Sequence, residues 1–159
     1  MNARKKLLIS LLGGVGLFAL LMLGMIGWFG SMGATVAWLN GESVYIYPKK
    51  IDLGNQEPGT ETVVTFYMKN LTSKEISVVG EKSSCTCAFS EKIPISAKVG
   101  NTAELKVNIH LPKYESTYDQ VISFMIAEPN RLALHPVQVT AKVPNPLPVP
   151  QENENNVEQ

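Results

Sequence analysis

The stretch that decides the fold is TAELKVNIHL, residues 102–111. Every second side chain in it is apolar: Ala103, Leu105, Val107, Ile109 and Leu111. Successive side chains of a β-strand point to opposite faces, so this spacing predicts a strand with one buried face and one solvated face. In a helix the same residues would scatter around the axis.

The same alternation recurs through the middle of the chain. It is clear in residues 62–69, 118–127 and 136–143, and weaker in residues 43–47, 75–79 and 85–89. Phe66 and Phe124 fall on the inward faces, and turn residues such as Pro58, Gly59 and Gly100 separate the runs. About seven short strands in roughly 100 residues predict an all-β, immunoglobulin-like antiparallel sandwich, with no sign of a parallel sheet.

An apolar segment precedes these strands. From Leu7 to Phe29 the chain carries no charge, and as a helix these residues would reach about 34 Å, enough to cross a bilayer. The basic residues 4–6 come before it. By the positive-inside rule they predict a single-pass inner-membrane protein, with its N-terminus in the cytoplasm and the following domain in the periplasm or outside. A cleaved signal peptide ending near Ala34 or Ala37 is the alternative, and it would export the domain as well.

Three regions follow from these patterns. Residues 1–37 are predicted to form the cytoplasmic basic end and a transmembrane signal-anchor, which touches membrane lipid, and residues 38–143 the sandwich. Residues 144–159 are predicted to be a proline-rich spacer followed by a disordered acidic tail. Without the basic residues 4–6, eleven Lys and Arg face fourteen Asp and Glu. That balance argues against a nucleic-acid partner.

Several short motifs fall in a recognisable order. They are Ile51-Asp52-Leu53-Gly54, Gly59, residues 63–66, Asn70, Ser84-Cys85-Thr86-Cys87, Pro94-Ile95 and Gly100. In order and spacing this region, about residues 45–143, resembles a family of exported bacterial domains of unknown function that carry a Cys-Gly-Cys motif. The resemblance implies an immunoglobulin-like fold of the abnormal-spindle and Hydin type. Thr86 stands where that family has glycine, and residues 96–100 replace its short Pro-Gly turn.

The two cysteines, Cys85 and Cys87, form the one group in the sequence that suggests chemistry. In an extended strand their Cα atoms would lie about 6.6 Å apart, at the outer limit for a disulfide, so a bridge requires a local kink. Three interpretations stay open: a structural disulfide or thiol pair, a redox or copper site, and inert buried cysteines. The possible further copper ligands are His110, His135, Met68 and Met125.

No pattern typical of an enzyme or a cofactor site is present in the sequence. Asp52 and Asp119 are the only aspartates, and neither has the sequence context of a catalytic group. The histidines lack the spacing of a structural zinc site. The sequence therefore predicts a non-enzymatic interaction or structural module of the cell envelope, which binds another envelope protein through an edge strand or a sheet face. The alternative is a thiol-redox or copper-handling protein that uses Cys85 and Cys87.

Overall fold

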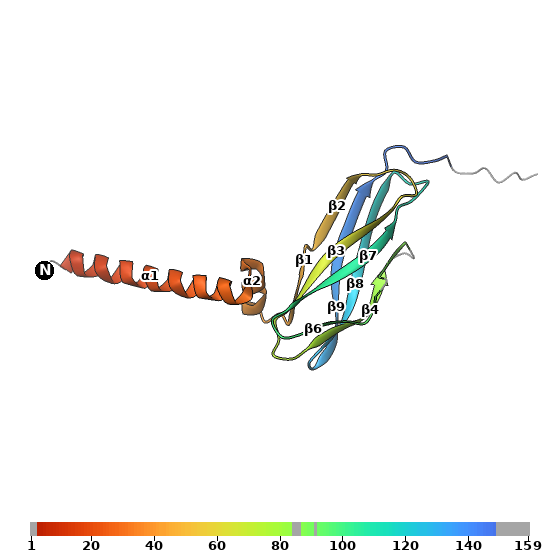
Figure 1. Ribbon diagram of the computed structural model, residues 1–159. Helices are drawn as coiled ribbons and strands as arrows, with labels where there is room; N and C mark the ends of the chain where they lie inside the picture. The colour runs from red at the N-terminus through yellow and green to blue at the C-terminus, as the bar shows by residue number, and fades with distance from the viewer. Residues whose placement is uncertain (1–2, 84–86, 91, 149–159) are drawn as a thin grey trace, which may run out of the picture.

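The computed structural model describes residues 3–83, 87–90 and 92–148. Within them the chain forms two helices followed by nine strands, arranged as two stacked sheets (Figure 1). The helices are α1 (Ala3–Phe29) and α2 (Met32–Leu39). The strands are β1 (Val44–Tyr47), β2 (Lys50–Asn55), β3 (Glu61–Asn70), β4 (Ile76–Ser83), β5 (Ala88–Ser90), β6 (Ile95–Ala97), β7 (Thr102–His110), β8 (Thr117–Glu128) and β9 (Arg131–Lys142).

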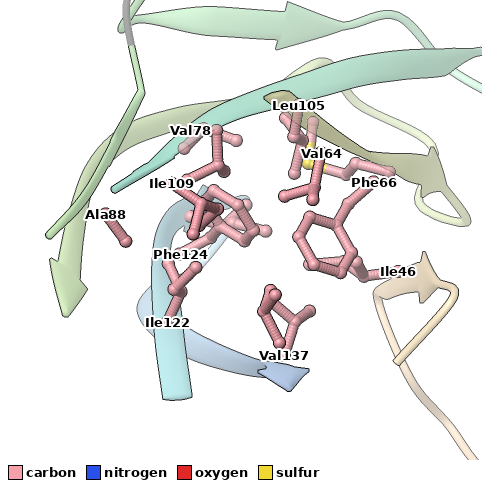
Figure 2. Packing of buried hydrophobic residues seen from close by; sticks show 14 of the residues in the cluster. Ile46, Val64, Phe66, Val78, Ala88, Leu105, Ile109, Ile122, Phe124 and Val137 are labelled. Atoms are coloured by element: carbon pink, nitrogen blue, oxygen red, sulfur yellow. The ribbon is translucent and has the colours of Figure 1, made fainter. Parts of the chain in front are cut away.

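The inward side chains of the two sheets meet in one hydrophobic core. One sheet has the order β1-β3-β7-β5 and the other β2-β9-β8-β4-β6. Phe66 and Phe124 lie at the centre with their rings edge to face, 6.1 Å between centroids (Figure 2). Both are essentially inaccessible to solvent. The prediction of an immunoglobulin-like sandwich and of the inward faces of these strands is therefore confirmed.

The set of strands differs from the prediction in three places. The strands β2 and β6 were not predicted, and β9 begins at Arg131 rather than at residue 136. One pair of neighbours is parallel, because β2 runs alongside β9 with Ile51 opposite Val139. The chain reaches this position by passing from one sheet to the other after β1. The alternation in β2 is short, with only Ile51 and Leu53 as apolar residues, and both are partly buried against the core.

The prediction of a membrane-spanning segment is contradicted. Among the residues whose side chains are described, no helix is long and apolar enough to cross a membrane. The predicted single-pass inner-membrane location is therefore corrected. The side chains of Leu7 and Phe29, the predicted limits of the anchor, lie outside those described.

The short helix α2 packs against the sandwich. Its first turn is capped by Ser31, whose side-chain oxygen accepts a hydrogen bond from the Ala34 amide at 3.1 Å. Ala34 and Ala37 are buried, whereas Gly33 lies against the ring of Tyr45, with no room for a side chain. Tyr45 in turn stacks on Tyr47 at 5.2 Å. Small residues therefore allow α2 to approach β1 closely.

Candidate functional site

Cys87 lies just before β5 and is disulfide-bonded. Its carbonyl accepts a hydrogen bond from the His110 amide at 2.8 Å, and its sulfur lies 3.8 Å from the Tyr118 hydroxyl. Burial raises the pKa of Tyr118 to about 12, so this hydroxyl stays protonated at neutral pH. Cys85, the other cysteine of the sequence, lies outside the described residues, so its pairing with Cys87 stays a prediction.

The candidate copper ligands do not gather around Cys87. His110 is its neighbour, but the imidazole Nδ1 lies 3.0 Å from a Glu61 carboxylate oxygen, and the ring stacks on Phe89. Met68 is buried in the core, seven residues from His110 along the β3 and β7 register, which corresponds to about 23 Å. Within the described residues, no three His, Cys, Asp or Glu side chains are arranged to hold a metal ion.

The remaining candidates lie on the other sheet. His135 Nε2 is 2.9 Å from a carboxylate oxygen of Glu128, and Met125 is opposite Leu134 in the β8 and β9 register.

A pocket of about 350 Å³ does lie beside Cys87, lined by His110, Tyr118 and other mostly polar residues. The disulfide state of Cys87 leaves no thiolate in this pocket for Cu(I) to bind.

A second feature, which we call the apolar face, lies on the outer surface of β4, β8 and β9. The strand register places four rows of side chains on this surface. From the β8–β9 turn onward the rows are Leu132 with Ala127 and Ser77; Leu134 with Met125 and Gly80; Pro136 with Ser123 and Lys82; and Gln138 with Val121. Most of these residues are apolar although they point away from the core.

The exposure of this face is unusual for an antiparallel sandwich. Leu132 and Leu134 remain 59% and 56% exposed, and Val121 remains 46% exposed. An antiparallel sheet normally buries one face and presents polar side chains on the other. Beyond the four rows the same surface becomes polar, with Asp119 accepting a hydrogen bond from Gln138 at 2.6 Å. The apolar face is thus confined to one half of the sheet.

Sequence reasoning missed this face because it began the last strand at residue 136. The signal was present in residues 132–135, LALH, where leucine alternates with a smaller or polar residue. In an isolated strand, however, either set of alternate residues can face the core. The structure begins β9 at Arg131, and because Val137 and Val139 are buried, the alternation places Leu132 and Leu134 on the outer face.

A buried carboxylate supports the end of the sheet that carries the apolar face. The Glu128 side chain is 2% exposed, and its oxygens lie 2.9 Å from Arg131 Nε and 2.9 Å from His135 Nε2. Burial raises the pKa of this carboxyl, but hydrogen bonds from Arg131, His135 and Ser43 outweigh it and hold the pKa below its ordinary value of 4.5. Glu128 therefore connects the β8–β9 turn to the segment that precedes β1.

This cluster predicts a loss of stability in acid. A carboxyl whose pKa is lowered by folding contributes stability above its unfolded pKa and loses that stability as the pH falls through its folded pKa. We expect the Glu128→Gln variant to lose less stability than the wild type between about pH 6 and about pH 3. Urea unfolding at each pH measures the difference. The matched control is Glu104→Gln, because Glu104 forms only an exposed ion pair with Lys106. Parallel pH curves for wild type and Glu128→Gln would contradict the prediction.

Comparison with known proteins supports the fold. The chain is similar to the ASH/PapD-like domain 7 of human CEP192, at 14% identity and a TM-score of 0.50, over 64% of this chain and 84% of that one. It is also similar to the Vibrio cholerae VesB protease, at 11% identity and a TM-score of 0.54, over 69% of this chain and 35% of that one. A protein of unknown function from Porphyromonas gingivalis W83 matches at 13% identity and a TM-score of 0.51, over 63% and 46%.

These similarities show an immunoglobulin-like, PapD-like sandwich and nothing finer. The match spans less than half of the Vibrio and Porphyromonas chains, so it corresponds to one part of each. No family model matches the sequence, and no curated protein matches it. The resemblance to an exported Cys-Gly-Cys family therefore stays a prediction beyond its immunoglobulin-like fold.

Proposed function

We propose that the sandwich is a non-catalytic protein-binding module and that it binds its partner through the apolar face. The observation that carries the proposal is the exposure of Leu132 and Leu134 on the outer surface of a sheet whose core is already complete. Contiguous exposed apolar surface on a soluble domain is characteristic of an interaction site. Met125, at the centre of the face, has a flexible side chain that can adapt to a partner.

The sheet edges are less suited to binding a partner. Of the four edge strands, β5 and β6 have three residues each, and β1 has four. The longest, β2, has six, but its register with β9 shifts near Gly54, which has a positive φ of 67°. Short or irregular edge strands resist the addition of another strand. The face is therefore the better of the two routes that the sequence left open.

The partner is proposed to be a different protein and not a second copy of this chain. The charged side chains that flank the apolar face across the sheet, Lys50 and Lys82, are both basic, whereas Asp52 and Asp119 lie in the row beyond Gln138. Two copies packed face to face would bring these like charges to the border of one apolar interface, which opposes association. A redox or copper function is not proposed, because no described residue around Cys87 supports it.

Photo-crosslinking in the native host tests the proposed face. A photoreactive amino acid replaces Leu134, and the matched control carries it at Val63, which is 59% exposed on the outer surface of the other sheet. We expect a discrete adduct from position 134 but not from position 63, and its loss when Leu132→Ser is added. No adduct from position 134 would overturn the proposal. An adduct at twice the 17.4 kDa of the chain would identify a second copy instead.

A further inference from the structure

The apolar face has a basic side chain on each side. Lys82 of β4 lies in the row of Ser123 and Pro136, and Lys50 of β2 extends the row of Gln138. Both point outward, because their neighbours along the strands, Glu81 and Ile51, oppose the inward residues Phe124 and Val139. Within the four rows these two lysines are the only charged side chains, and neither forms an ion pair with a described residue. The acidic residues of this surface, Asp52 and Asp119, lie in the next row, at one end of the face and not at its sides.

The spacing of the two lysines fits the width of a helix. The sheet order β2-β9-β8-β4 places three inter-strand spacings between Lys50 and Lys82, or about 14 Å. A helix with its side chains is about 10 to 12 Å across. Laid along β8 and β9, it would cover the apolar face and have one lysine on each side. The four rows extend about 20 Å along the strands, which about 13 helical residues would match.

We propose that the partner segment is an amphipathic α-helix with an apolar stripe of leucine-like side chains and acidic residues on both sides of that stripe. The proposal rests on the proposed function and names the partner of the same face. Exposed apolar sheet surface is commonly buried under a helix, and carboxylates beside the stripe would meet Lys50 and Lys82. The chain's own α1 does not fill this role, because it extends away from the sandwich (Figure 1).

Two synthetic peptides test this inference on the full-length protein. Both are 18-residue helices with the same leucine stripe, but one has glutamate and the other lysine on both sides of it. Fluorescence anisotropy of the labelled peptides measures their affinities. We expect the glutamate peptide to bind about tenfold more tightly at low salt, and the difference to shrink to less than about twofold in high salt.

Variants separate the charge from the apolar contact. The Lys50→Glu and Lys82→Glu double variant should reverse the preference, so that the lysine peptide binds more tightly. The Lys106→Glu variant, on the outer surface of the other sheet, should leave it unchanged. Leu132→Ser with Leu134→Ser should weaken both peptides at least tenfold. These substitutions are on the surface, and circular dichroism verifies that each variant is folded.

The outcomes distinguish the two proposals. If both peptides bind equally and the leucine variant binds neither, the apolar face is a binding surface but the acidic helix is wrong. If the leucine variant binds as the wild type does, the face does not take part and both proposals fail. If neither peptide binds the wild type, the helical partner is overturned, and the photo-crosslinking at position 134 decides the proposed function separately.

Discussion

Replacing Phe124 with alanine is expected to lower the free energy of unfolding by roughly 3 to 5 kcal/mol. The ring is buried at the centre of the core, on β8, and packs edge to face on Phe66 of β3. Its loss removes buried apolar area and leaves a cavity between two sheets, whose backbones are held apart by the remaining side chains. Urea or thermal unfolding measures the change.

Phe89→Ala is the matched control for this prediction. Phe89 is an aromatic residue at the surface, 42% exposed, on the edge strand β5. Its removal should cost less than about 1 kcal/mol, mainly through the loss of its stacking on His110. A cost below about 1 kcal/mol for Phe124→Ala would mean that the inward and outward faces of β8 are reversed.

Replacing Asn70 with alanine is expected to cost about 2 to 4 kcal/mol. The side chain is 1% exposed at the end of β3, and its amide nitrogen donates to the carbonyl oxygens of Lys74 at 2.7 Å and Ala97 at 2.9 Å. Its carbonyl oxygen accepts a hydrogen bond from the Thr72 amide at 2.8 Å. Alanine would leave the buried Ala97 carbonyl without this donor, which carries the desolvation cost of an unmade hydrogen bond.

Two further variants separate hydrogen bonding from size. Asn70→Asp keeps the shape and the acceptor but cannot donate to the two carbonyls, so we expect it to cost at least as much as alanine. Thr72→Val removes a hydroxyl group that is hydrogen-bonded to Asn70 and to the Lys74 carbonyl oxygen. This hydroxyl lies closer to the surface than the Asn70 amide, so its removal should cost less stability than Asn70→Ala. Chemical denaturation measures all three. An Asn70→Asp variant as stable as the wild type would contradict this account.

Strand alternation predicted the core well. The periods through residues 102–111 and 62–69 correctly identified Leu105, Val107, Ile109 and Phe66 as inward, because a two-residue period determines which side chains share a face. The same reasoning did not predict α2. This helix has only eight residues, about two turns, and it directly follows the longer apolar segment. It also did not identify Glu128 as a buried partner of Arg131 and His135. These two residues follow Glu128 by three and seven positions, and their side chains reach it only because the chain turns back in the β8–β9 hairpin.

The cysteine motif shows how far local sequence can predict a site. The sequence indicated that Cys85 and Cys87 are the two residues able to form a bridge, and Cys87 is disulfide-bonded. Which candidate ligands lie near Cys87 depended on strand register. His110 pairs across β5 and β7 and therefore lies beside it, whereas Met68, on a different part of β3, does not.

The sequence by itself determined that this protein is a two-layer β-sandwich with an alternating core, because apolar period and turn residues are local properties of the chain. Only the tertiary structure decided which strands are neighbours, and with them the parallel β2 and β9 pair and the apolar face with its two lysines. Leu132, Met125 and Lys82 come from three strands, and nothing in their spacing along the chain indicates that they share a surface. Alternation determines which residues share a face of one strand, but the register between strands determines which faces combine into a site.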